Sequence, residues 1–174
     1  MNKEWAELNK TMQLQIKKKE TFAMGIDTLL ALRKTLMEQI MQFKNELSPE
    51  DFSAMPYMNA KGYHNKTIAY SLWHIFRIED IVVHSLIADD EQVFFQKDYQ
   101  KRINSPIITT GNELVKEEIR NFSEQLSLKE LYHYITDVDK STTQILRALA
   151  YSDIKLKITD EKRRNLELLN VVSN

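Results

Sequence analysis

The stretch KTIAYSLWHIFRIEDIVVHSLIA, residues 66–88, decides the fold of this chain. Apolar residues would cover much of its circumference in a helix, so it predicts a central and largely buried helix. Its β-branched residues would also suit a strand. The length of the stretch favours a helix, because strands are usually about 3–10 residues long.

The composition of the whole chain also favours helices. Its 174 residues include only 3 Gly and 3 Pro, where an average protein would have roughly twenty. Hairpins and tight turns consume these residues, so most sheet proteins are excluded. The 43% of hydrophobic and 28% of charged residues are typical of a folded globular protein. A chain of this length fits one domain, and we expect residues 1–174 to form it.

Further helices are expected on both sides of this stretch. Before it, apolar residues at intervals of three and four from Trp5 to Leu47 predict one long helix, or two with a kink at Gly25. Ser48-Pro49-Glu50-Asp51 predicts the N-cap and acidic first turn of a short helix. After it, apolar periodicity predicts helices over 112–126, 128–149 and 159–172.

The residues that follow the central stretch form a long connection. Phe94, Phe95 and Tyr99 suggest a short helix that packs as a lid, and a loop through Pro106 comes after it. This connection is long enough to cross the end of a helical bundle. The second and third main helices therefore need not be antiparallel neighbours.

Polar side chains are concentrated within the central helix. Trp73-His-Ile-Phe-Arg-Ile-Glu-Asp80 places an imidazole, a guanidinium and two carboxylates among apolar residues. At about 100° per residue, His74 and Arg77 share one face, whereas Glu79 and Asp80 turn away from it. A buried histidine can bind a metal ion through one ring nitrogen while a partner holds the other. In the alternative, His74 is a core histidine bonded to a carboxylate or the backbone, and Arg77 pairs with an acid on a neighbouring helix.

The string from Thr67 to Asp80 resembles the second helix of the DinB/YfiT-like superfamily, and Gln92-Val-Phe94, Tyr99 and Thr110-Gly111 resemble the segment after it. The resemblance covers roughly residues 22–150. It implies an all-α, dimeric four-helix bundle with a long crossover between the second and third main helices. Many members bind a divalent metal, often nickel or zinc, through one histidine on the second helix and an HxxxH pair on the last. Some branches are thiol-dependent S-transferases or isomerases, and most have no assigned activity.

Of the family's metal ligands, only His74 has a counterpart in this chain. No histidine follows His133, so the HxxxH pair is absent. Either the protein lost the metal site and kept the scaffold, or other residues complete the site, or a longer natural chain supplies the missing pair. His133 is the candidate second ligand, because the parallel helices that the resemblance implies would place it at a depth similar to that of His74. In the alternative, His133 is a stacked or solvent-facing histidine, since Tyr132 and Tyr134 lie beside it. His84 lies about 15 Å along the helix axis from His74, too far to share one ion.

Composition and motifs exclude several other functions. The absence of Cys removes disulfides, Cys-zinc sites and thiol nucleophiles. With 24 basic and 25 acidic residues, the chain has no global basic excess for nucleic acid. No apolar run approaches the roughly 20 residues of a membrane span, and no secretory signal is found, so we expect a cytoplasmic protein. The serines show no nucleophile-elbow context, and there is no Gly-rich phosphate loop.

Two hypotheses of different class follow. The first is a divalent-metal-dependent, transferase-like enzyme that acts on a small molecule, with a nickel or zinc ion at His74 and His133. The second is a non-catalytic helical scaffold or binding protein that has lost the metal site. Both expect a homodimer without nucleic-acid or membrane partners. Metal analysis of the purified protein beside its His74→Ala and His133→Ala variants distinguishes them.

Overall fold

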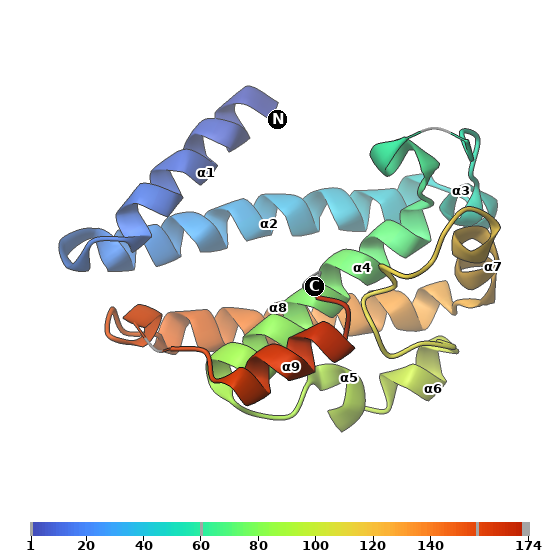
Figure 1. The fold of residues 1–174 in the computed structure, drawn as a ribbon. Helices are drawn as coiled ribbons and strands as arrows, with labels where there is room; N and C mark the ends of the chain where they lie inside the picture. The colour runs from blue at the N-terminus through green and yellow to red at the C-terminus, as the bar shows by residue number, and fades with distance from the viewer. Residues whose placement is uncertain (1, 60, 156, 172–174) are drawn as a thin grey trace. The chain divides into compact units, whose positions relative to one another are not determined.

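The computed structural model describes residues 2–59, 61–155 and 157–171 (Figure 1). It is 73% helix, and the described residues include no strand. This confirms the predicted all-α class. The α-helices are α1 (Asn2–Ile16), α2 (Phe22–Glu46), α3 (Pro49–Ser53), α4 (Ile68–Asp80), α5 (Val93–Gln96), α6 (Tyr99–Ile103), α7 (Glu117–Gln125), α8 (Leu128–Ala148) and α9 (Asp160–Leu168). A π-helix, η3 (Ile81–Ala88), and short 3₁₀ turns, η1 (Lys19–Thr21), η2 (Gly62–Asn65) and η4 (Asp153–Lys155), complete the elements.

The chain divides into two compact units. The first comprises residues 1–47 and 143–157, and the second comprises residues 48–142 and 158–174. Helix α8 contributes to both, because the division falls between Thr142 and Thr143. The expectation of a single domain stays a prediction. Among the described residues, no helix is both long and apolar enough to cross a membrane.

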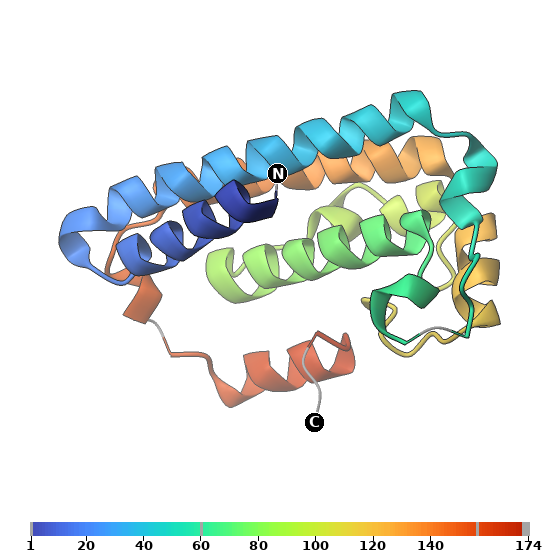
Figure 2. The same ribbon diagram turned by 90° about the horizontal axis from the view of Figure 1, so that it is seen from above.

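In the first unit, α1 and α2 form a helical hairpin (Figures 1 and 2). The break between them lies at residues 17–21, and α2 continues through Gly25 without interruption. Both expected alternatives, one long helix and a kink at Gly25, are therefore wrong. Gly25 instead allows a close helix crossing, since a Cβ there would lie 2.7 Å from Ile16 Cγ1 and 2.8 Å from Ile16 N.

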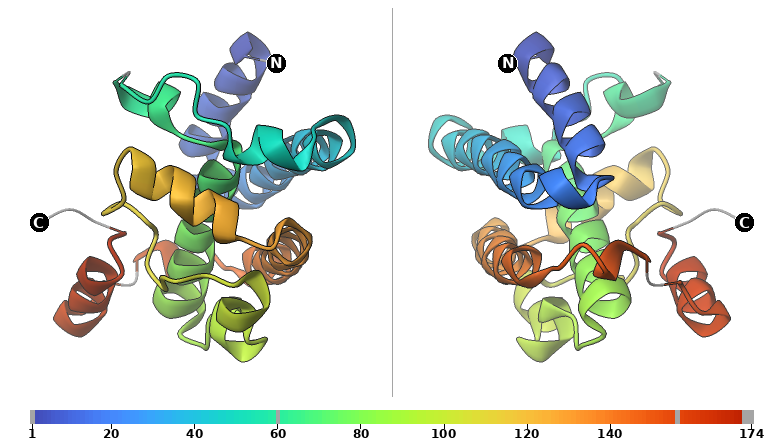
Figure 3. Two further views of the ribbon diagram at one scale, coloured as in Figure 1. Left: turned by 90° about the vertical axis from the view of Figure 1, so that its right-hand side faces the viewer. Right: turned by 90° about the vertical axis from the view of Figure 1, so that its left-hand side faces the viewer.

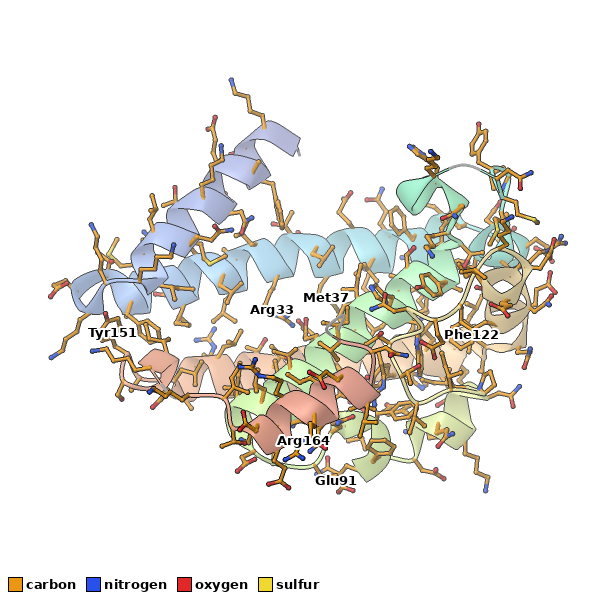
Figure 4. All side chains as sticks on the ribbon, in the orientation of Figure 1. Arg33, Met37, Glu91, Phe122, Tyr151 and Arg164 are labelled. Atoms are coloured by element: carbon orange, nitrogen blue, oxygen red, sulfur yellow. The ribbon has the colours of Figure 1, made fainter. Side chains whose placement is uncertain are left out.

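The end of α8 closes the core of this unit. Phe22 and Ile26 of α2 are buried together with Leu146 of α8. Tyr151, labelled in Figure 4, packs edge-on against the Phe22 ring at 5.8 Å, and its hydroxyl donates to the Lys17 carbonyl at 3.1 Å. These contacts fasten the turn between α1 and α2 to the chain after α8.

In the second unit, α4 continues directly into η3, so residues 68–88 form one helical rod. Thr67 caps its start, because its hydroxyl accepts from the Tyr70 amide at 3.0 Å. Trp73, Phe76 and Ile81 are at most 1% exposed, which confirms the expected central, buried helix. The rod ends at Asp89, which adopts the left-handed conformation with φ of 59°.

The connecting segment, residues 89–127, holds α5, α6 and α7 between η3 and α8. The helix expected over 112–126 begins only at Glu117, because residues 112–116 form turns and Lys116 has a φ of 48°. Figure 3 shows α7 crossing near the start of α4. There Phe122, labelled in Figure 4, lies 5.5 Å from the Trp73 ring.

The predicted helix starts at Ser48 and Thr159 are confirmed. The Ser48 hydroxyl accepts from the Asp51 amide, and the Asp51 carboxylate accepts from the Ser48 amide at 2.9 Å, which is a complete capping box. The Thr159 hydroxyl accepts from the Lys162 amide at 3.2 Å. The helix expected over 159–172 ends at Leu168, and residue 172 lies outside the described residues.

Candidate functional site

One face of α4 holds the connecting segment through three side-chain donors. Spacings of four and three residues place the donors on the same face of the helix. Their acceptors are backbone carbonyls, which follow in the reverse order along the chain, so residues 108–111 run antiparallel to α4. The bonds are Tyr70 hydroxyl to Gly111 O at 3.0 Å, His74 Nδ1 to Thr110 O at 2.9 Å, and Arg77 Nε to Ile108 O at 2.9 Å.

The bond from His74 sets the chemistry of its imidazole. A carbonyl oxygen only accepts, so Nδ1 carries the hydrogen, and Nε2 of the neutral ring keeps its lone pair. The ring is half-buried and stacks on Tyr70, with 5.6 Å between centroids and 10° between planes. Burial and the charge of Glu113 raise the pKa of Tyr70, so its hydroxyl remains a donor at neutral pH. The backbone-bonded histidine expected as an alternative is confirmed, and Nε2 of that histidine can still bind a ligand.

Thr110 joins this loop to the end of α9. Its amide donates to the Leu169 carbonyl at 3.1 Å, and its hydroxyl donates to the Asn170 carbonyl at 2.8 Å. The Asn112 side chain donates to the same Asn170 carbonyl, and the Asn170 side chain donates to Glu113 at 2.8 Å. Thr110, whose carbonyl orients the His74 imidazole, is therefore bonded both to α4 and to the end of α9.

His133 has a different environment. Its side chain, on α8, is 47% exposed, and Nδ1 lies 3.3 Å from Glu130 Oε1 one turn earlier. Within the described part of the chain, it shares no partner with His74, and no three His, Cys, Asp or Glu side chains are grouped so as to hold a metal ion. A site with only His74 and His133 as protein ligands falls outside that finding and stays a prediction. His64 is exposed.

Asp80 is the buried charge that sequence reasoning missed. It was expected to turn away from Arg77, but the structure places its carboxylate 3.5 Å from Arg77 NH1, with both side chains fully buried. The carboxylate accepts from the amides of Val93 and Phe94, each at 2.9 Å, and from the Tyr134 hydroxyl at 2.8 Å. Burial, and then the charge of Asp80, raise the pKa of Tyr134 well above its usual value, so this hydroxyl stays protonated.

Arg77 extends the same network into the connecting segment. Its NH2 donates to Gln92 Oε1 at 2.6 Å, and Gln92 donates to the Ser85 hydroxyl at 2.7 Å. Its guanidinium also lies over the Phe94 ring, 4.4 Å from the centroid. The expected acid on a neighbouring helix is wrong, because the charged partner is Asp80 on the same helix. A carboxylate three residues after an arginine in an apolar helix was the available sequence signal.

Comparison with protein-family models, with curated proteins and with solved structures finds no match to this chain. The function must therefore be inferred from the residues of the chain itself. They define an all-helical protein with two features on α4: an oriented, half-buried imidazole at His74, and a buried Arg77–Asp80 network that fixes the connecting segment.

Proposed function

We propose that this protein is a DinB-like helical protein that binds a divalent metal ion, nickel or zinc, at Nε2 of His74 for transferase-like chemistry on a small molecule. The observation that carries the proposal is the 2.9 Å bond from His74 Nδ1 to the Thr110 carbonyl. Metal-binding histidines almost always donate their other ring N–H to a carbonyl or carboxylate, which fixes the tautomer and the ring orientation. A bound ion would act as a Lewis acid toward the substrate.

The proposal includes the fold and assembly that the resemblance implies. The connecting segment fits the long crossover of a four-helix bundle, since it spans residues 89–127 between the rod of α4 and η3 and the next long helix, α8. The second metal ligand is predicted to be His133. The homodimer and the cytoplasmic location also remain predictions.

A second candidate function, a non-catalytic helical scaffold or binding protein, is favoured by Arg77 and Asp80. Both side chains are fully buried. Their hydrogen bonds to the backbone of Ile108 and Val93 hold the connecting segment and α5 in place. In this alternative, the bond from His74 to Thr110 serves the same purpose of holding the loop. The two candidates differ in whether Nε2 of His74 binds a metal ion.

Metal binding by the chelator-treated protein tests the proposal. We expect isothermal titration with Ni²⁺ or Zn²⁺ to show one ion per chain, with affinity reduced at least tenfold in His74→Ala. That factor is the lower end of the effect of losing an outer-shell partner. His64→Ala is the matched control, because this histidine is exposed and lies before α4. His133→Ala shows whether His133 is the second ligand.

His74→Asn separates the metal from the fold. Asn keeps an N–H donor for the Thr110 carbonyl but has no imidazole, so we expect normal thermal stability without metal binding. A wild-type protein that binds neither ion, and whose melting temperature does not respond to them, would exclude the metal site and leave the scaffold function.

A further inference from the structure

A serine, a histidine and a carboxylate form a hydrogen-bonded series at the end of the rod of α4 and η3. The Ser141 hydroxyl, on α8, forms a hydrogen bond with Nε2 of His84 at 3.1 Å. Nδ1 of the same ring donates to Asp90 Oδ1 at 2.5 Å. His84 is buried, Ser141 is half-buried, and the Asp90 side chain is 54% exposed. The sequence contained no signal for this series, because its members lie on three different elements.

The order of the three groups matches that of a nucleophile, its base and an orienting carboxylate. Asp90 holds the hydrogen on Nδ1, so the lone pair of Nε2 faces the Ser141 hydroxyl. Asp80 Oδ1 also lies near Nε2, but at 3.8 Å it is beyond hydrogen-bond distance. Ser141 is therefore the group whose proton Nε2 can accept.

The backbone around Asp90 brings its carboxylate back to the helix. Asp89 adopts the left-handed conformation, and the Asp90 amide then donates to the His84 carbonyl at 3.0 Å. The Asp89 carboxylate also pairs with Lys162 of α9 at 2.7 Å. The turn that carries Asp90 is thus held from two directions, and the imidazole is oriented before any substrate arrives.

We propose that Ser141 is a nucleophile, activated by His84 and oriented by Asp90, that accepts acyl groups from small carboxylic esters. Ser141 Oγ bonds to the ester carbonyl carbon as the bond to the leaving alcohol breaks. His84 Nε2 takes the hydroxyl proton and gives it to the leaving oxygen. Water then attacks the acyl-serine, again with His84 as base, and releases the acid while Ser141 recovers its proton. No metal takes part, so this site is independent of His74.

The charges nearby define the ester class. Asp89, Asp90 and Glu91 are exposed at this turn. Lys162 pairs with Asp89, so among the described residues the three acidic residues have one lysine to balance them. Their negative potential favours uncharged or cationic esters over anionic ones.

Covalent labelling tests the proposal directly. The intact protein, in EDTA, is incubated with diisopropyl fluorophosphate, and adducts are located by peptide mass spectrometry. We expect one adduct, on Ser141, absent in Ser141→Ala and unchanged in Ser53→Ala, a half-buried serine on α3. Hydrolysis of p-nitrophenyl acetate is expected to fall in parallel.

The Asp90→Asn variant keeps the test decisive if substitution of buried His84 prevents folding. Asp90 is exposed, so its replacement by Asn removes the carboxylate that keeps the hydrogen on Nδ1 of His84 but leaves no cavity in the core. We expect labelling and hydrolysis to slow about 100-fold or more, the scale of general-base catalysis. Absence of an adduct, an adduct at another residue, or an Asp90→Asn rate equal to that of the wild type would each overturn the proposal. Because EDTA removes metal ions from this assay, none of these outcomes bears on metal binding at His74.

Discussion

Replacing Asp80 by Asn is expected to lower the free energy of unfolding by about 3–5 kcal/mol, the cost of breaking a buried ion pair by removing one partner. The variant keeps the size of the side chain but removes the charge that faces Arg77 at 3.5 Å. It also puts an NH₂ group where an oxygen accepted from the Val93 amide, or from the Phe94 amide and the Tyr134 hydroxyl. Hydrogen bonds to a charged acceptor contribute about 1.5–3 kcal/mol each. The one oxygen of the Asn side chain can still accept some of these bonds, so part of their free energy is kept.

Urea unfolding followed by the fluorescence of Trp73 measures this loss. The Trp73 ring lies 5.5 Å from the Phe94 ring and 6.3 Å from the Tyr134 ring, beside the network. The chain has two Trp residues, so a Trp5→Phe background leaves Trp73 as the only reporter. Glu124→Gln is the matched control, because its pair with Arg120 is exposed and contributes about 0.5 kcal/mol or less.

A loss below about 1 kcal/mol in Asp80→Asn would refute the reasoning, since a buried guanidinium left without its carboxylate cannot be neutral in energy. If that variant does not fold, Tyr134→Phe provides the measurement. It removes one donor to Asp80 and leaves the ion pair, so we expect a loss of about 1.5–3 kcal/mol. An unchanged Tyr134→Phe would contradict the buried network.

Three further outcomes are expected. Gly25→Ala should lose about 1–3 kcal/mol by overpacking, because its Cβ would meet α1 at 2.7 Å; a gain, measured by thermal unfolding, would contradict the close crossing. Ser48→Ala should lose about 1 kcal/mol with the cap of α3, and an unchanged melting temperature would show that this cap is unimportant. Burial raises the pKa of Asp137, but hydrogen bonds from Tyr99 and Lys97 lower it, so its pKa in the folded protein is below the usual value. The stability that the Asp137 carboxylate contributes is therefore present above its unfolded-state pKa and is lost as pH falls through its folded-state pKa. The stability difference between wild type and Asp137→Asn should therefore be largest near neutral pH and vanish in acid, whereas a pH-independent difference would argue against this ionised pair.

Gly25 and Asp80 show where sequence reasoning stops. A glycine within a periodic stretch is typical of a kink, but Gly25 serves a contact with Ile16, nine positions earlier, that only the hairpin creates. Angular spacing placed Asp80 away from Arg77, whereas side-chain reach and burial bring the two together. His74 was identified from the sequence because an imidazole in an apolar helix is rare. Its partner was not, since a backbone carbonyl has no residue-type signature.

The sequence alone determined the helical class, the central helix predicted over about 66–88 and the helix starts at Ser48 and Thr159. These depend on periodicity and capping, which act between residues within a few positions of one another. Only the tertiary structure decided which polar groups meet: His74 with Thr110, Arg77 with Ile108, and Ser141 with His84. Those partners lie 31 to 57 positions apart, and packing of the connecting segment and α8 against α4 and η3 brings them together.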